Sequence, residues 1–461
     1  MGLGQIMTLA NSIIGVSVLA MPFCFKQCGI ILSILVLFLS SIMTRLACHF
    51  LLKAAVLARR RNYEFLGELF TKCIVRNYPL LQNKVIYLIL VYFSAFHAFG
   101  PKGKLMVELC IIGFLFGTCI AFFVVMGDLG PAIISEMLDV NKSPSIRSSV
   151  LIGLALLVVL PLGLLRNVDS LSSLCTATIL FYFFLVLKIM SEATTHLLAG
   201  DWLQYVHLWR PAGILQCIPI FAMALSCQTQ VFEIYESLPD PSLPKMNEVV
   251  RAAVNICTGV YVCMGFFGYV AVCGPSTSIL GEKSLPPPPL TGNILMSFPS
   301  SFSMQAIKLF FVASIACSFP LVIFPCRASL HSLLYRRVPH HESGVSGSGA
   351  GGGSASTVSL LPPGSSGTQA LERIPERRFR LLTILLVAGS LAIAFALPDI
   401  ELVLGLVGSS IGTITCLLLP ALCFLKVAPS HPYHHSRYGG GKGVTAERLL
   451  AQVCLPFFYY K

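Results

Sequence analysis

Long apolar runs recur along the whole chain, and they restrict it to one class of fold. Only 11% of the 461 residues are charged, against about 25% in a typical soluble domain, so a soluble surface cannot be covered. Backbone groups in lipid must be bonded within the chain, and no alternating strand pattern appears. The sequence predicts an all-α polytopic membrane protein. It excludes a soluble enzyme, a disordered chain and a nucleic-acid binder.

Ten runs are long enough to cross a bilayer as helices. Their predicted ranges are about 3–25, 30–57, 105–127, 146–165, 171–191, 214–236, 248–273, 303–330, 380–397 and 399–425. An eleventh run, residues 85–100, is short for a span. We expect it to be re-entrant or interfacial, because a crossing here would place the basic loop after the eighth span outside.

Basic side chains gather beside the apolar runs, which predicts the orientation of the chain. The clusters are Lys53 with Arg59, Arg60 and Arg61, then Arg327, Arg336 and Arg337, then Arg373, Arg377, Arg378 and Arg380. Such clusters are typical of cytoplasmic flanks, so the N-terminus is expected in the cytoplasm. The ionisable residues Glu108, Asp128, Lys188 and Glu233 are expected near span ends, where snorkelling is cheap.

Two segments between spans have compositions of their own. Residues 339–378 are predicted to be a flexible cytoplasmic linker, because Gly and Ser dominate between Val345 and Gln369. Asn141 begins a glycosylation sequon in a predicted outer loop, although Pro144 follows it and weakens the case.

The first and sixth spans carry polar and helix-breaking residues inside apolar runs: Asn11, Ser12, Gly15, Ser17 and Pro22, then Pro219, Ser226, Gln228, Thr229 and Gln230. Interrupted helices five apart indicate a transporter site of the inverted-repeat kind, with five helices in each half. Freed N–H groups at such breaks suit a carboxylate, and freed carbonyls suit a cation. The alternative, that the small residues only allow close helix packing, stays open.

The eighth span offers a second set of neutral oxygens. Ser314 and Ser318 are four residues apart, so their hydroxyls share a helix face and could complete a cation shell. Bonds back to their own helix are the alternative. The chain shows no C-x-x-C pair, nucleophile–base constellation, metal-ligand spacing or phosphate loop. The pattern therefore favours a non-enzyme without a cofactor, apart from a candidate sodium ion.

Five stretches resemble the sodium-coupled neutral amino-acid transporters of the amino acid/auxin permease superfamily: residues 10–30, 117–130, 266–272, 291–299 and 319–330. The resemblance implies eleven helices with the fold of bacterial neurotransmitter-sodium symporters. The implied substrate-binding residues are Asn11, Ile14, Gly15, Val16, Ser17, Phe221, Ala222 and Ser226. The implied sodium ligands are Asn11, Ser314 and Ser318.

Residues 1–425 would form the ten-helix core of such a protein. Residues 65–95 look like an insertion relative to the family, and residues 426–461 stand where its eleventh helix and the long tail of some members are expected.

The predicted function is secondary active transport of neutral and polar amino acids (the glutamine, glutamate and alanine class) by alternating access. Sodium is the candidate coupling ion. The alternative is a membrane sensor that binds an amino acid and transports little. Expected partners are the amino-acid substrate and membrane lipid, and the oligomeric state stays open. The membrane is expected to be the plasma membrane or a Golgi or endolysosomal membrane.

Overall fold

The computed structural model describes residues 3–57, 102–139, 143–165, 172–236, 238, 242–273, 291–299, 301–335 and 374–427. Within these ranges the chain is helical and contains no β-strand. The prediction of an all-α protein is therefore confirmed for the described residues. The pairing of two inverted five-helix halves stays a prediction.

The helices follow the apolar runs closely. In the first half they are α1 (Leu3–Ile14), α2 (Ser17–Cys28), α3 (Ile30–Leu57), α6 (Lys102–Met137), α7 (Pro144–Leu154), η1 (Ala155–Val159), α8 (Leu160–Gly163) and α9 (Ser172–Ala199). They continue with η3 (Asp201–Gln204), η4 (Pro211–Gly213), α10 (Ile214–Ala224), α11 (Val231–Glu236), α12 (Leu243–Cys273) and η5 (Ile294–Met296). The last are α13 (Phe302–Leu334), α15 (Glu376–Ala396), α16 (Ile400–Val407), η6 (Gly408–Gly412), η7 (Ile414–Leu418) and α17 (Leu419–Val427).

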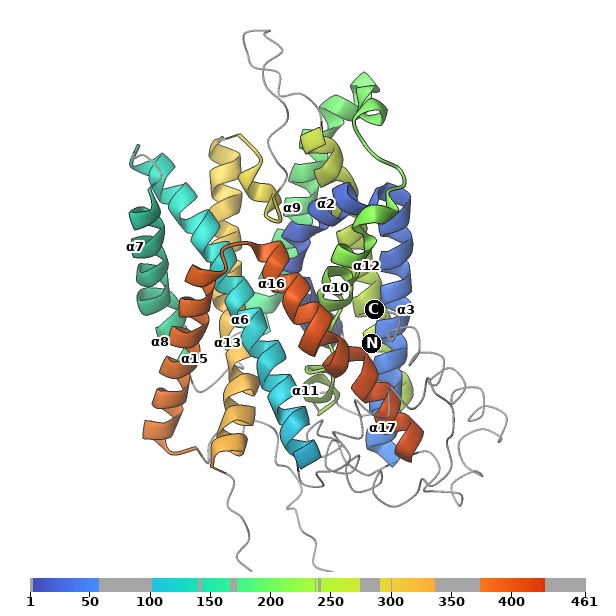
Figure 1. Cartoon of the computed structure of the whole chain (residues 1–461), viewed down its shortest axis with the longest axis vertical. Helices are drawn as coiled ribbons and strands as arrows, with labels where there is room; N and C mark the ends of the chain where they lie inside the picture. Colours follow the sequence, from blue (N-terminus) through green and yellow to red (C-terminus); the bar gives the residue numbers. More distant parts are fainter. Residues whose placement is uncertain are drawn as a thin grey trace, which may run out of the picture.

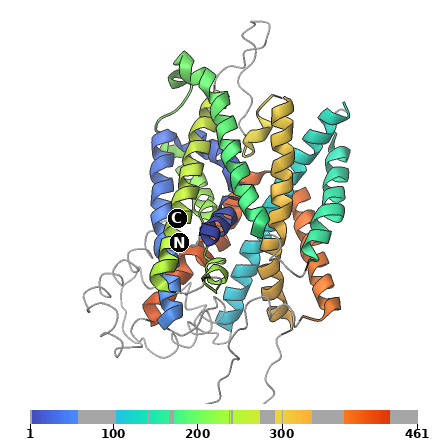
Figure 2. The same ribbon diagram turned by 180° about the vertical axis from the view of Figure 1, so that it is seen from behind.

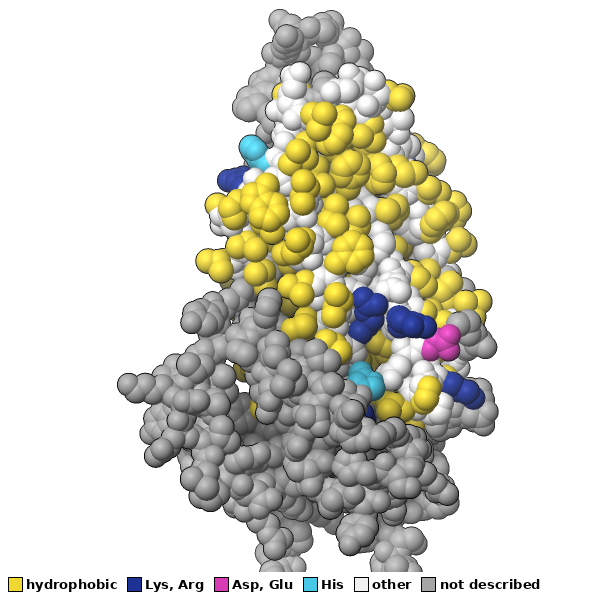
Figure 3. All heavy atoms as spheres, turned by 90° about the vertical axis from the view of Figure 1, so that its right-hand side faces the viewer, with side chains coloured by type: hydrophobic (Ala, Val, Ile, Leu, Met, Phe, Trp, Pro, Cys, Tyr) yellow, Lys and Arg dark blue, Asp and Glu magenta, His cyan; other side chains and the backbone are white. Residues whose placement is uncertain are grey.

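Length and apolar composition make this a multi-pass membrane protein. Among the described residues, seven helices could each cross a bilayer, or nine if each bent pair is one span. The predicted sixth span is divided between α10 and α11, and α10 is too short to cross by itself. Apolar side chains cover the middle and upper part of one face, as Figure 3 shows, and most of the visible Lys and Arg side chains gather towards its lower end.

The helices pack in two groups that share a few connecting elements. In the first group, α6 lies along α13 and both contact α15, while α7 packs on α6 and α8 on α13. In the second group, α12 packs against α1, α2 and α3. Helix α9 contacts α1, α12 and α13, and α16 connects α6 with α10 (Figure 1). Seen from behind, the dark-blue α1 lies at mid-height in the bundle (Figure 2).

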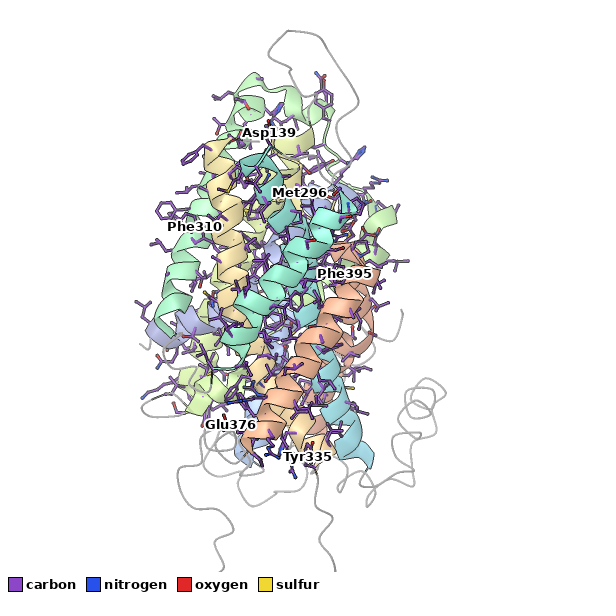
Figure 4. The ribbon with its side chains drawn as sticks, turned by 90° about the vertical axis from the view of Figure 1, so that its left-hand side faces the viewer. Asp139, Met296, Phe310, Tyr335, Glu376 and Phe395 are labelled. Atoms are coloured by element: carbon purple, nitrogen blue, oxygen red, sulfur yellow. The ribbon has the colours of Figure 1, made fainter. Side chains whose placement is uncertain are left out.

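Several ends of the described helices lie at the same end of the bundle. Helix α3 ends and α6 begins at the lower end in Figure 1. Tyr335 and Glu376 also lie together at that end, opposite Asp139 (Figure 4). The predicted insertion 65–95, the short run 85–100, Asn141 and the tail after Val427 lie outside the described residues. Which end faces the cytoplasm stays a prediction.

The predicted end of the third span at residue 127 is wrong, because α6 continues to Met137. Pro131 cannot donate to the carbonyl of Gly127, four residues earlier. The Arg147 side chain of α7 compensates, since its Nε donates to the Gly127 oxygen at 3.3 Å. Asp128 therefore lies inside the helix rather than at its end, and its carboxylate pairs with Arg147 at 3.4 Å. Lys188, near a predicted span end, pairs with Glu192.

The predicted boundaries of the linker and the last span also change. Helix α15 begins at Glu376, so the last three residues of the predicted linker 339–378 are helical. The final helical segment extends to Val427 and bends by 41° between residues 412 and 414. This bend was not predicted. Gly408 lies so close to Pro219 of α10 that an added Cβ would stand 2.4 Å from the Pro219 oxygen.

Candidate functional site

The first span is broken where the sequence placed Gly15. Helix α1 ends at Ile14, α2 begins at Ser17, and the two axes differ by 56°. Gly15 has a φ of +37°, a backbone conformation that other L-residues rarely adopt. Val16 has an apolar side chain and provides no hydrogen bond that caps α2. The first N–H groups of α2, at Ser17 and Val18, therefore have no side-chain cap from this position.

The second break is longer. Helix α10 ends at Ala224, and α11 begins at Val231. Within the break, the Ser226 hydroxyl donates to the Met223 carbonyl at 2.6 Å. The backbone N–H of Cys227 donates to Oε1 of Gln228 at 2.9 Å. Side chains in the break thus satisfy some of the backbone groups that the lost helical turn releases.

One hydroxyl from α12 meets the ends of both broken spans. The Oη of Tyr261 lies 2.8 Å from the carbonyl oxygen of Ile13 and 3.1 Å from that of Ile14. It lies 2.9 Å from the carbonyl oxygen of Ala224, the last residue of α10. Tyr261 is completely buried, and Ser17 of α2 also interacts with this hydroxyl. We call Tyr261 and these three carbonyls the Tyr261 junction.

Two buried polar atoms near the breaks lack a hydrogen-bond partner among the described residues. They are Oδ1 of Asn11, one turn before the first break, and Nε2 of Gln228, inside the second. The exposed fractions of these residues are 4% and 1%. A buried polar group without a partner costs about 1–3 kcal/mol. One acceptor and one donor are therefore available to a ligand.

Aromatic rings lie beside the first break. The ring of Phe122 on α6 is 3.9 Å from the position that a Cβ would take at Gly15. Phe122 and Phe123 both contact the ring of Phe319 on α13, with centroids 6.1 and 5.1 Å apart. This side of the site is apolar.

The predicted sodium ligands of α13 lie in different surroundings. The Ser314 hydroxyl is buried and lies 3.3 Å from that of Tyr182 on α9. Ser318 is half-buried and makes no hydrogen bond within the described residues. Neither serine bonds back to its own helix in this part of the chain. No described hydrogen bond joins these hydroxyls to α1, so the sodium site stays a prediction. No group of three or more His, Cys, Asp or Glu side chains among the described residues could hold a metal ion.

The remaining predicted site residues flank the two breaks. Ile14, Val16, Ser17 and Phe221 are buried, whereas Gly15, Ala222 and Ser226 are half-buried. Tyr261 and Gln228 were missing from the predicted set. Gln228 was visible as a polar residue in an apolar run, but Tyr261 had no such signal, because a tyrosine in a membrane helix is common at interfaces.

Arg327 was predicted in a basic cluster that flanks the eighth span, and the flanking position is wrong, whereas the cytoplasmic side stays a prediction. It lies within α13 and is 1% exposed. One guanidinium nitrogen donates to the Gly163 carbonyl at 2.9 Å and to the Thr383 hydroxyl at 2.7 Å. Its Cζ lies 3.8 Å from the ring centroid of Phe379. We call these contacts the Arg327 clamp; they join α8, α13 and α15.

Broken spans whose freed backbone groups meet inside a bundle are characteristic of helical membrane transporters. The chain belongs to the family of transmembrane amino acid transporter proteins, whose family model matches residues 3–436.

Several relatives are similar along most of the chain. The putative sodium-coupled neutral amino acid transporter 10 of Xenopus laevis is 35% identical over 92% of this chain and 34% of its own length. Solute carrier family 38 member 10 of Homo sapiens is 36% identical over 92% of this chain and 32% of its own length. This chain thus spans about a third of the length of these curated relatives.

One more distant relative and one solved structure also align with the chain. Vacuolar amino acid transporter 5 of Schizosaccharomyces pombe is 22% identical over 90% of this chain and 82% of its own length. A crystal structure of the Eremococcus coleocola manganese transporter, in complex with an aromatic bis-isothiourea substituted compound, aligns with a TM-score of 0.42 at 10% identity. That alignment covers 99% of this chain and 92% of the other.

Proposed function

We propose that this protein carries neutral and polar amino acids of the glutamine, glutamate and alanine class across a membrane by alternating access. The observation that carries the proposal is the meeting of both broken spans at the Tyr261 junction. Two unpartnered polar atoms, on Asn11 and Gln228, lie in or next to these breaks. An amino acid supplies both the donor and the acceptor that these atoms need.

The two charged groups of an amino acid suit the two kinds of freed backbone group. The carboxylate would bind the uncapped N–H groups at the start of α2, where the helix dipole is positive. The ammonium group would bind the carbonyl end of α1, assisted by Oδ1 of Asn11. The side chain would lie towards Gly15 and the ring of Phe122.

The selection for neutral and polar side chains follows from the composition of the breaks. Neither residues 9–18 nor residues 219–231 include a charged amino acid. A charged side chain brought into this buried region would lose its water without gaining a counter-charge from these stretches. A neutral or amide side chain avoids that cost, so within this class glutamine and alanine are favoured over glutamate.

Sodium is the coupling ion in this proposal, held by neutral oxygens of Asn11, Ser314, Ser318 and the α1 carbonyls. Within the described residues the Ser318 hydroxyl makes no hydrogen bond, so it is available for such a role. Losing one contact to a charged group costs about 1.5–3 kcal/mol. Ser318→Ala and Asn11→Ala should therefore each raise the half-saturating sodium concentration about tenfold or more. Uptake that is unchanged when choline replaces sodium would remove sodium from the mechanism and leave the amino-acid site in place.

The test of transport is uptake by the purified chain in liposomes. A panel of radiolabelled amino acids should show accumulation of glutamine and alanine, weaker uptake of glutamate, and little uptake of lysine or arginine. Empty liposomes and boiled protein are the controls. Binding of glutamine without accumulation would contradict transport and support the alternative of an amino-acid sensor.

The cellular location is proposed from relatives and charge. Relatives named as vacuolar amino acid transporters favour an intracellular membrane, in the Golgi or endolysosomal system, over the plasma membrane. A cytoplasmic N-terminus follows from the basic clusters near residues 53–61 and 373–380. An epitope inserted at Gly351 should be detected once the plasma membrane alone is permeabilised, while the organelle membranes are still intact. Detection only after the organelle membrane is opened would contradict this orientation.

A further inference from the structure

The Tyr261 junction contains more acceptors than its donor can satisfy. A tyrosine hydroxyl has one proton, yet three carbonyl oxygens lie within 3.1 Å of Oη. The hydroxyl can donate to one of them at a time. The donated bond can therefore pass between Ile13 or Ile14 in α1 and Ala224 in α10 by rotation of the proton about the C–O bond.

These carbonyls are also the negative ends of two helices. Ile13 and Ile14 close α1, and Ala224 closes α10. The last carbonyls of a helix have no partner within it, and they carry the negative end of its dipole. The two ends converge on one fully buried oxygen, although they belong to spans far apart in the sequence.

We propose that Tyr261 is the positioning residue that couples the two breaks, so that a change in the hydrogen bonding of one break alters the stability of the other. This rests on the proposed function. A ligand ammonium at the α1 carbonyls takes over their bonding and releases the Tyr261 proton to Ala224. Binding at the first break thereby tightens the second. Without a ligand, the two breaks compete for the same proton.

The same helix offers a matched control. Tyr269 lies two turns further along α12 and is 2% exposed. Its hydroxyl accepts a hydrogen bond from the backbone N–H of His207 at 3.0 Å. His207 belongs to the connection between α9 and α10 and to neither break. Tyr269→Phe therefore removes a buried hydroxyl of the same kind without touching the junction.

Hydrogen exchange of the full chain in detergent tests the coupling without requiring transport. In Tyr261→Phe, peptides covering residues 9–20 and 219–232 should both exchange about tenfold faster than in the wild type. In Tyr269→Phe, the peptide containing His207 should change, and both break peptides should stay within about twofold of the wild type. Faster exchange at only one break, or equal effects of the two variants, would overturn the proposal.

A second pair of variants changes the first break instead of Tyr261. It tests the coupling if Tyr261→Phe does not fold. Gly15→Ala strains the first break, because Gly15 has a positive φ, while Phe122 at 3.9 Å leaves room for the methyl group. Gly200→Ala introduces the same kind of strain at a φ of +72°, with no atom within 4 Å and outside the breaks. Coupling predicts faster exchange at residues 219–232 in Gly15→Ala but not in Gly200→Ala. An unchanged second break in Gly15→Ala would overturn it.

Uptake measurements separate this proposal from the proposed function. If the wild type accumulates amino acids, turnover per folded molecule should fall about tenfold in Tyr261→Phe and stay within about twofold in Tyr269→Phe. A folded Tyr261→Phe protein that transports like the wild type would contradict the coupling role. If the wild type accumulates nothing, the transport function fails, and the exchange experiments still decide whether Tyr261 couples the breaks.

Discussion

The Tyr261 junction and the Arg327 clamp both supply hydrogen-bond donors to carbonyls at the ends of helices, but they use different chemical groups. In both, a fully buried side chain from one helix is a donor within reach of carbonyls at the C-terminal ends of other helices. These carbonyls belong to Ile14 and Ala224 at the junction and to Gly163 at the clamp. The junction uses a neutral hydroxyl with one proton for three carbonyls. The clamp uses a charged guanidinium, which has five N–H donors in a fixed fork.

The difference teaches which parts of the bundle can rearrange. A hydroxyl proton can change partner at small cost, because its acceptors are equivalent and uncharged. A buried guanidinium holds a carbonyl, a hydroxyl and the Phe379 ring together, and separating them would leave a charge without compensation. We therefore expect the junction to govern activity and the clamp to govern stability.

The largest loss of stability is expected for Arg327→Ala. The substitution leaves the Gly163 carbonyl without this donor and opens a cavity beside Phe379. Together these cost about 3–5 kcal/mol. The melting temperature of the purified protein in detergent is the measurement. Arg380→Ala, which removes an exposed arginine of α15, is the control and should melt at the same temperature as the wild type. If Arg327→Ala melts at the same temperature as this control, the clamp does not govern stability.

Tyr261→Phe should cost less stability, about 1–3 kcal/mol, because it leaves acceptors unsatisfied but strands no charge. Melting temperature and uptake per folded molecule, measured on the same preparations, should therefore rank the junction and clamp variants in opposite orders. Arg327→Lys, which keeps the charge, should transport nearly normally for each folded molecule, whereas Tyr261→Phe should not. If uptake follows melting temperature across both variants, the division between activity and stability is wrong.

Gly408→Ala tests whether packing also positions α10, whose end forms part of the junction. An added methyl group would press on the Pro219 carbonyl at 2.4 Å, so the helices must move apart. Such overpacking costs about 1–3 kcal/mol. Gly405, three residues earlier, has no atom within 4 Å of an added Cβ. Gly405→Ala should therefore be neutral or stabilising by up to about 1 kcal/mol in thermal unfolding. Equal melting of the two variants would show that this close approach is unimportant.

The smallest effect is expected for Arg147→Ala, which separates the influence of charge from that of burial. Arg147 pairs with Asp128 at 3.4 Å, with side chains 30% and 23% exposed. Partly hydrated pairs contribute about 0–1 kcal/mol, and the lost bond from Nε to the part-buried Gly127 carbonyl adds about 0.5–1.5 kcal/mol. The same melting assay should show a shift much smaller than that of Arg327→Ala. A comparable shift would mean that charge, rather than complete burial, makes the clamp strong.

Much of the fold could be predicted, because membrane helices obey local rules. The apolar runs located the helices, and polar residues inside two of them located the breaks near Gly15 and Ser226. The predicted end of the third span was wrong, because Pro131 is unfavourable inside a helix and the freed Gly127 carbonyl is bonded by Arg147 of a neighbouring helix, which no local pattern shows. Arg327 was misplaced because a charge near a span end usually snorkels to water.

The sequence by itself determined that this chain is a helical membrane protein, and where its first and sixth spans break. Both follow from what each segment must satisfy alone in lipid: enough apolar length, and internal bonds for its backbone. Only the tertiary structure decided which donor serves each freed carbonyl. Tyr261 stands 248 residues from Ile13 in the chain, and no local pattern links them. Hydrogen bonds between helices depend on which faces the packing brings together, and that is a property of the whole bundle.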